Sequence, residues 1–248
     1  MTYSFAEHKK AWSSPPVDDI GYIAAGDLLN MPDREFRSLI KRAEKNRYEG
    51  WRNWRGRWRL VLKLDNTHGM NVLDYGSGIG IEALQYARSG NIVSLADIVK
   101  DNLKVAKRTL GIDGYACANE FLIKKDTLIL PKHKYDIIHC CGVLHHIREP
   151  EVIVRDWAKY VLVPNGELRL MVYTDKAWTI STKTEPPEIV EGHPKALSFA
   201  RTWDEVGSYA DWYDADRLEK RFGKWFSLEE YEPLTVNGVY AGAIMRRK

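Results

Sequence analysis

The chain has 248 residues, of which 44% are hydrophobic and 29% are charged, and its net charge is only +3. This composition is typical of a soluble globular protein with one large domain, and it disfavours wholesale disorder and extensive contact with nucleic-acid phosphates. No apolar run approaches the roughly 18 residues of a membrane-spanning helix, and charges interrupt the first residues where a signal peptide would be apolar. We therefore expect a cytoplasmic protein with no membrane partner.

Charge is unevenly distributed along the chain. Residues 34–63 hold eleven Lys or Arg against three Glu, whereas residues 185–232 hold twelve acidic side chains against six basic ones. The contrast predicts either that a pocket has a basic and an acidic side, or that the two segments pack together.

The N-terminal part of the chain has helical spacing. Residues 33–64 predict two helices, the first with Asp33 as its N-cap. The second contains the run WRNWRGRWR at 51–59, in which Gly56 weakens a helix. Projected on a helix, the tryptophans form an apolar stripe beside a basic one, so the run favours a packed helix over a nucleic-acid surface. The apolar stripe consists of Trp51, Trp54, Trp58 and Val61 or Leu62, and the basic stripe of Arg52, Arg55 and Arg59.

Short apolar runs alternate with helical stretches from Met70 onward, which predicts a parallel sheet covered on both faces. The chain ends differently, in runs at 227–236 and 239–247 joined through Asn237-Gly238, a strong hairpin signal. We therefore predict an α/β fold. It has a doubly wound, mostly parallel seven-stranded sheet that ends in an antiparallel hairpin, in a domain at 69–248 behind a helical extension at 1–68. The strand-like runs are 70–75, 91–97, 119–125, 135–141 and 166–173, and the helical ones are 80–90, 100–111 and 150–162.

A glycine-rich loop follows the first predicted strand. Gly76, Gly78 and Gly80 permit a tight turn and let a ligand approach the backbone, and the next helix presents its first amides there. Asp97 closes the second strand, where a carboxylate can accept hydrogen bonds from both hydroxyls of a ribose; the simpler alternative is a helix N-cap. The spacing is GxGxG and not the GxGxxG of dinucleotide sites.

Five motifs in sequence carry a family resemblance: VLDYGSGIG, LADI, KKDTLILP, YDIIHCCGVLHHI and VLVPNGELRL. In this order and spacing they resemble the motifs of class I S-adenosylmethionine-dependent methyltransferases, in the style of the small-molecule group that includes quinone-biosynthesis enzymes. The resemblance covers about residues 70–173 and the terminal hairpin. VPNG departs from the usual lysine-proline-glycine-glycine, although Asn tolerates the left-handed conformation of that turn.

The resemblance implies S-adenosylmethionine as cofactor, with S-adenosylhomocysteine as product, and a set of contacts. The first loop would hold the methionine part, with Asp74 near its ammonium group. Asp97 would bind the ribose, and Ile98 would pack on the adenine. The implied cofactor residues are Asp74, Tyr75, Gly76, Ser77 and Gly78; Asp97 and Ile98; Asp126 and Thr127 at the adenine amino group; and Cys141 and Gly142 along the methionine and sulfonium side.

Two histidines, His145 and His146, follow the fourth predicted strand where an acceptor would approach. A sulfonium methyl is already electrophilic, so a base is needed only for a hydroxyl or a protonated amine, and one of the pair is the candidate. Adjacent side chains diverge, and Cys140 and Cys141 lack CxxC spacing, so we expect no metal.

The resemblance implies that the N-terminal extension and the insertion after the fifth predicted strand choose the acceptor. This insertion, 174–212, is too irregular for a simple crossover and predicts a lid. It interleaves aromatic and acidic side chains that suit a cationic amine or a sugar, unless they are merely the packed start of the next helix. The arginines of 51–59 suit an anionic acceptor instead. The candidate acceptor residues are Trp54, Arg55, Tyr173, Trp203 and Tyr209.

These patterns predict methyl transfer to an oxygen or nitrogen of a small molecule. HCCGVLHH matches neither DNA amino-methylating nor cytosine C5-methylating motifs, so nucleic acid is not favoured, although RNA or a protein stays an alternative acceptor. A nicotinamide-dependent oxidoreductase and a non-catalytic cofactor-binding module are the alternatives from other classes.

Overall fold

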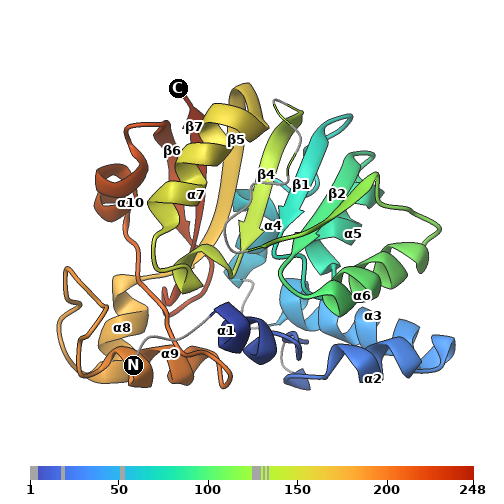
Figure 1. Cartoon of the computed structure of the whole chain (residues 1–248), viewed down its shortest axis with the longest axis horizontal. Coiled ribbons are helices and arrows are strands. Elements are labelled where there is room, and N and C mark those ends of the chain that lie inside the picture. The colour runs from blue at the N-terminus through green and yellow to red at the C-terminus, as the bar shows by residue number, and fades with distance from the viewer. Residues whose placement is uncertain (1–4, 18–19, 51–53, 125–129, 131, 133) are drawn as a thin grey trace.

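A single seven-stranded sheet organises the chain (Figure 1), in the strand order β3-β2-β1-β4-β5-β7-β6. The computed structural model describes residues 5–17, 20–50, 54–124, 130, 132 and 134–248. The pairs among β1 to β5 are parallel, and β7 runs antiparallel to both β5 and β6. The predicted fold class is therefore confirmed. The strands are β1 Asn71–Tyr75, β2 Ile92–Asp97, β3 Asn119–Leu122, β4 Tyr135–Cys141, β5 Leu162–Tyr173, β6 Phe226–Pro233 and β7 Tyr240–Arg247.

Two hydrophobic clusters cover the two faces of this sheet. Neighbouring residues of β1 point to opposite sides, so Val72 belongs to one cluster and Leu73 to the other. The first cluster packs α3 to α6 against the sheet, and the second packs α7 and α10. These helices are α3 Asp33–Glu49, α4 Arg57–Val61, α5 Ile81–Arg88, α6 Lys100–Gly111, α7 Pro150–Asp156 and α10 Ala215–Phe222.

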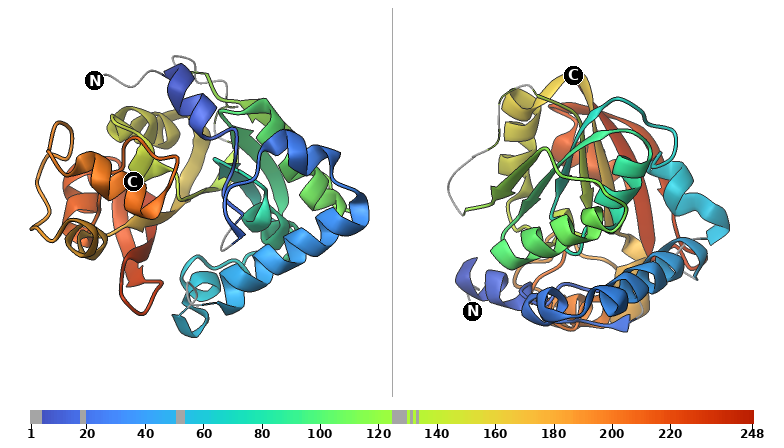
Figure 2. Two further views of the ribbon diagram at one scale, coloured as in Figure 1. Left: turned by 90° about the horizontal axis from the view of Figure 1, so that it is seen from below. Right: turned by 90° about the vertical axis from the view of Figure 1, so that its right-hand side faces the viewer.

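The remaining helices gather at the carboxyl edge of the parallel strands (Figure 2, left). Seen from that edge, α1 and α2 of the N-terminal part lie on one side, and α8 and α9 of the segment 174–212 lie on the other. Ligands bind at this edge in open parallel sheets. The bounds are α1 Phe5–Ala11, α2 Ala25–Asn30, α8 Asp175–Thr182 and α9 Ala196–Trp203.

Two of three local predictions were wrong in detail. Asp33 is the first residue of α3, whose N-cap is Pro32, and its carboxylate pairs with Arg108 of α6. Residues 51–53 of the helix expected through 51–59 lie outside the described residues, and the rest is interrupted, because Gly56 has a φ of 73°, ends a short 3-10 turn at Trp54–Gly56 and is the N-cap of α4. The predicted terminal hairpin is confirmed: β6 and β7 pair antiparallel, and their connection contains Asn237-Gly238, where the amide of Gly238 donates to the carbonyl of Thr235 at 3.0 Å.

The basic and acidic segments do pack together in part. Arg57 of α4 forms an ion pair with Glu232 of β6, and Lys63 pairs with Glu230 of the same strand at 2.5 Å. Both pairs are partly exposed, so they orient α4 on the sheet more than they stabilise it. No helix in the described part of the chain is long and apolar enough to cross a membrane.

Replacing Trp58 with Ala should test how α4 is held. Trp58 is 2% exposed and packs edge-on against Tyr240 at 6.4 Å, so its loss should lower the free energy of unfolding by about 3 to 5 kcal/mol. Leu60 of the same helix is 64% exposed, and Leu60→Ala should change it by less than about 0.5 kcal/mol. Urea unfolding of both variants measures this, and equal effects would contradict the packing of α4 through Trp58.

Candidate active site

The glycine-rich loop joins β1 to α5 and is tied to β2. The amides of Gly76 and Ser77 donate to the carbonyl of Ala96 at 2.7 and 3.1 Å. A Cβ on Gly76, whose φ is 79°, would lie 2.2 Å from the side chain of Val143. A Cβ on Gly78 would meet its nearest neighbouring atoms only at 4.0 Å, so this residue leaves open space beside the backbone. The loop thus packs on one side and presents bare backbone on the other.

Asp97 ends β2 and holds the loop in place. Its Oδ2 accepts from the amide of Gly78 at 3.0 Å, and its Oδ1 accepts from the amide of Val99 at 2.8 Å and the side chain of Asn102 at 3.2 Å. Burial raises the pKa of Asp97 to about 6 against the lowering effect of these hydrogen bonds. Asp97 lines the cavity, so this carboxylate remains reachable by a ligand hydroxyl.

The acidic groups beside the loop differ from the prediction. Asp74 is 3% exposed and does not line the cavity, whereas Glu82 of α5 does, with Arg47 of α3 donating to its carboxylate. Burial and the charge of Glu82 raise the pKa of Asp74 well above its usual value. The thiol of Cys141, at the end of β4, lies 3.8 Å from the carboxylate of Glu82. Burial raises the pKa of this thiol well above the ordinary value. A cation and a carboxylate thus face the cavity together.

An apolar slot continues the cavity beyond Asp97. Ile98 lines it together with Ile123 and Leu130. Asp126 and Thr127, predicted beside the adenine, lie outside the described residues. Tyr75, Ser77 and Gly142 also line the cavity. The predicted cofactor residues of the described part therefore meet there, except Asp74, which does not line the cavity.

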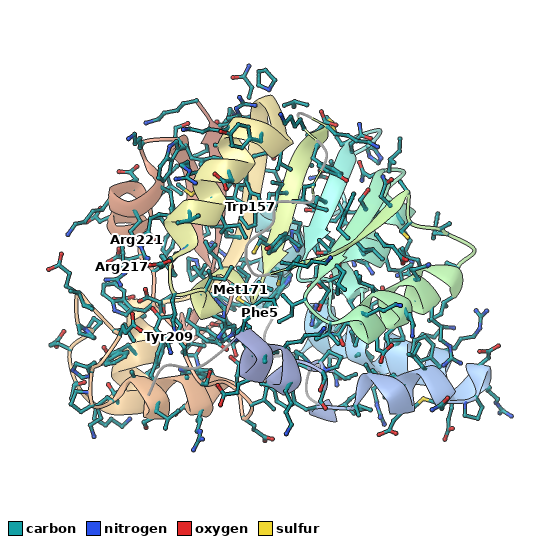
Figure 3. The ribbon with its side chains drawn as sticks, in the orientation of Figure 1. Phe5, Trp157, Met171, Tyr209, Arg217 and Arg221 are labelled. Carbon is teal, nitrogen blue, oxygen red and sulfur yellow. The ribbon has the colours of Figure 1, made fainter. Side chains whose placement is uncertain are left out.

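One cavity of about 1120 Å³ spans this region and the space beneath the N-terminal and 174–212 segments. Figure 3 shows Phe5 of α1, Met171 of β5 and Tyr209 after α9 at this edge of the sheet, and all three line the cavity. Such a volume exceeds that of most pockets for one drug-sized ligand, so it has room for a nucleoside cofactor and a small acceptor.

His145 and His146 differ in whether they reach the cavity. His145 is 0% exposed, does not line the cavity and stacks on Tyr173 with ring centroids 4.0 Å apart. Burial lowers its pKa well below the usual value, so its ring is neutral. His146 lines the cavity, with Nδ1 2.8 Å from the carbonyl of Tyr209 and Nε2 3.2 Å from Asp204. Sequence reasoning placed the pair together, but only His146 faces the cavity.

Asp204 connects the 174–212 segment to the rest of the site. It accepts hydrogen bonds from the hydroxyls of Tyr22, at 2.9 Å, and Tyr173. Burial acts to raise its pKa, but the charge and hydrogen bond of His146 and the hydrogen bond of Tyr173 lower it to about 2. Asp204 is therefore an ionised carboxylate at neutral pH.

The predicted acceptor residues divide into two groups. Tyr173, Trp203 and Tyr209 line the cavity. Trp54 does not; Arg57 covers its ring at 5.0 Å. The side chain of Arg55 lies outside the described part. Arg59 also turns away, pairing with Asp65 outside the cavity.

Sequence reasoning missed the cavity residues contributed by the N-terminal part. His8, Trp12 and Tyr22 line the cavity from positions that no motif marks. Burial, and then the charges of His146 and Arg148, lower the pKa of His8 to about 4, so it is neutral at pH 7. The resemblance implied that the N-terminal extension helps to choose the acceptor, but no local pattern marked these three residues.

Comparisons with known proteins agree with this geometry. A family profile described as "Methyltransferase domain" matches residues 34–234. A ubiquinone biosynthesis O-methyltransferase of Citrobacter koseri is 27% identical over 169 residues, which cover 67% of this chain and 68% of that protein. The chain belongs to the methyltransferase-domain family, and within it to the class I S-adenosylmethionine-dependent methyltransferases.

Solved structures show the same fold at low identity. A SAM-dependent methyltransferase from Aquifex aeolicus superimposes with a TM-score of 0.56 at 16% identity, over 86% of this chain and 98% of that one. The [4+2]-cyclase SpnF does so with a TM-score of 0.58 at 17% identity, over 78% of this chain and 82% of that one. A cyclase on this fold shows that the fold alone does not determine the reaction.

The cavity fits S-adenosylmethionine. Asp97 would accept from the ribose hydroxyls, the apolar slot would hold the adenine, and Glu82 with Arg47 offers opposite charges to the ammonium and carboxylate of the methionine part. Together Asp74, Glu82 and Asp97 place more acid than base around this half. The cofactor carries a net positive charge, which suits that excess.

The variant Asp97→Asn should weaken binding of S-adenosylhomocysteine at least about tenfold, because it removes charge-assisted hydrogen bonds. Ribose hydroxyls favour the ionised carboxylate, so binding should be strongest above pH 6 and weaken as the pH falls through about 6, where free Asp97 becomes protonated. Calorimetry at several pH values measures both effects. The matched control is Asp101→Asn, an exposed carboxylate of α6 paired with Lys104. Unchanged affinity in Asp97→Asn would mean that the ribose lies elsewhere.

Proposed function

We propose that this methyltransferase moves the methyl group of S-adenosylmethionine to a hydroxyl oxygen of a small aromatic or otherwise planar molecule. The observation that carries the proposal is the second half of the cavity, where aromatic rings surround one pair of polar groups, His146 and Asp204. The name of the Citrobacter relative, an O-methyltransferase, supports oxygen over nitrogen as the atom methylated.

The aromatic lining sets the character of the acceptor. Tyr173 and Tyr240 stack with centroids 5.6 Å apart, and Trp203 lies 6.2 Å from Tyr240. Trp12 covers His146 at 4.9 Å. Such walls bind flat apolar bodies and leave few polar contacts to orient them. We assign acceptor selection to the N-terminal extension, 1–68, and to the lid segment, 174–212.

The cofactor supplies a methyl carbon already activated by its sulfonium sulfur. The protein then has to hold the acceptor oxygen in line, exclude water and remove the acceptor proton. His146 and Asp204 are the polar groups positioned for this, because both line the acceptor half. We assign His145 no contact with the acceptor, since it is buried behind Tyr173.

The segments that cover part of the site also favour a small molecule over a polymer. The N-terminal part reaches the lid segment through the Tyr22 to Asp204 hydrogen bond, and it reaches α6 where Asn102 donates to the carbonyl of Trp12 at 3.0 Å. An RNA or protein acceptor would have to part these contacts. Transfer of labelled methyl groups to phenols and catechols, to amines, to total RNA and to bulk protein decides the acceptor class; labelled RNA or protein alone would overturn the proposal.

Replacing His146 with Gln should lower kcat by about 10² to 10⁴ while the affinity for S-adenosylhomocysteine stays within about twofold, because His146 lies on the acceptor side. The control is His68→Gln, a histidine on the surface whose Nδ1 donates to the carbonyl of Ser89. Steady-state kinetics with calorimetry measure both quantities. A kcat equal to that of His68→Gln would remove His146 from the reaction.

A further inference from the structure

Three buried side chains with metal-binding atoms meet at the wall of the acceptor half. His145 and His146 come from the short 3-10 turn Leu144–His146 after β4, and Asp204 follows α9. One ring nitrogen of each histidine and one carboxylate oxygen lie within 4.8 Å of one another. The ring centroids of the two histidines are 4.3 Å apart at an angle of 64°, so the neighbours do not diverge as the sequence suggested.

His146 has the environment of a metal ligand. Its Nδ1, 2.8 Å from the carbonyl of Tyr209, must carry a hydrogen to donate. A histidine that binds metal commonly donates its other nitrogen to a backbone carbonyl in this way. The Nε2 atom then directs its lone pair at the carboxylate of Asp204, 3.2 Å away. Two electron-rich atoms so placed require a cation between them, either a proton or a metal ion.

His145 distinguishes these two cations. Its ring is 0% exposed, and neither nitrogen has a hydrogen-bond partner among the described residues. Buried polar atoms without partners are rare and costly. A proton shared by His146 and Asp204 leaves both nitrogens of His145 without a partner, whereas an ion bound by all three residues gives one of these nitrogens a partner.

Asp204 is oriented as a ligating carboxylate would be. Tyr22 donates to Oδ1 at 2.9 Å, and Tyr173 donates to Oδ2. Carboxylates that bind metal are commonly fixed by hydrogen bonds of this kind. Both tyrosines line the cavity, so the cluster can be reached from it.

We propose that His145, His146 and Asp204 bind a divalent first-row transition-metal ion of the zinc or ferrous type. Two imidazole nitrogens and one carboxylate oxygen suit these ions, whereas magnesium and calcium prefer oxygen ligands throughout. The 3.2 Å between Nε2 and the carboxylate oxygen equals the separation of two neighbouring ligands that each lie about 2.0 to 2.2 Å from one ion. The remaining positions of the ion would face the cavity.

The described residues contain one other group of this kind, Glu82, His139 and Cys141. Arg47 already forms an ion pair with Glu82, so a metal ion there would meet a fixed positive charge. The histidine and aspartate cluster is therefore the stronger candidate, and the second group provides the control.

The role of the ion rests on the proposed function, although its binding does not. The ion would act as a Lewis acid on the acceptor hydroxyl. With the ion bound, His146 and Asp204 would serve as its ligands in place of accepting the hydroxyl proton directly, and the ion would lower the pKa of the bound hydroxyl. The hydroxyl proton then leaves to water in the cavity, the oxygen electron pair forms the bond to the methyl carbon, and the carbon–sulfur bond breaks with its electrons remaining on sulfur.

Metal binding can be measured directly on the full-length protein after chelator treatment. Titration with Zn²⁺ or Co²⁺ should show about one ion per chain and a raised Tm, and Mg²⁺ at equal concentration should not compete. The variants His145→Asn and Asp204→Asn should each weaken binding of Zn²⁺ by at least about tenfold. Cys141→Ser should bind as the wild type does.

The absorption spectrum of Co²⁺ bound to the wild-type protein identifies the ligand atoms even if a variant does not fold. Nitrogen and oxygen ligands predict d–d bands without a thiolate charge-transfer band. A thiolate band, loss of binding in Cys141→Ser, preference for Mg²⁺, or no binding by folded wild-type protein would each overturn the inference. Binding of S-adenosylhomocysteine and methyl transfer, measured separately, show whether the proposed function stands in either case.

Discussion

The buried carboxylate of Asp97 is the contact on which the geometry of this site depends. It fixes the glycine loop through Gly78 and the start of α6 through Asn102. Asn102 in turn donates to the carbonyl of Trp12, so the same group that would hold the ribose also anchors the N-terminal segment over the cavity. Cofactor contact and closure of the site are thus joined through a single side chain.

Charge divides the cavity into two halves. In the cofactor half, burial raises the pKa values of Asp74 and Asp97. The charge of Arg47 opposes this rise at Asp74 only in part. In the acceptor half the opposite occurs, since His146 lowers the pKa of Asp204. Acidic side chains without basic partners favour a cationic ligand, and the cofactor is such a ligand. A carboxylate paired with His146 is held in place, which suits a group that must position a reacting oxygen.

The fold and the cofactor half were predictable because their signals are local. A strand, a glycine turn and Asp97 at the next strand end lie within thirty residues, and parallel topology brings such ends together. The Asn237-Gly238 signal for a terminal hairpin was local as well, and it held. The N-cap predicted at Asp33 failed, and the carboxylate of Asp33 pairs with Arg108 of α6 instead. The acceptor half was only partly predictable, since Tyr22 and Asp204 meet across 182 positions and neither belongs to a motif.

That long-range contact also explains how one fold serves different reactions. The sheet and glycine loop position the cofactor half, whereas the hydrogen bond from Tyr22 to Asp204 ties the N-terminal part to the lid segment, and Tyr173 of β5 donates to the same carboxylate. Substitutions in the lid segment can reshape the acceptor half without direct contact with Asp97. Because Asp204 fixes the lid and faces His146 at once, any change that moves the lid also moves the polar centre of the acceptor half, so acceptor choice and reactivity change together.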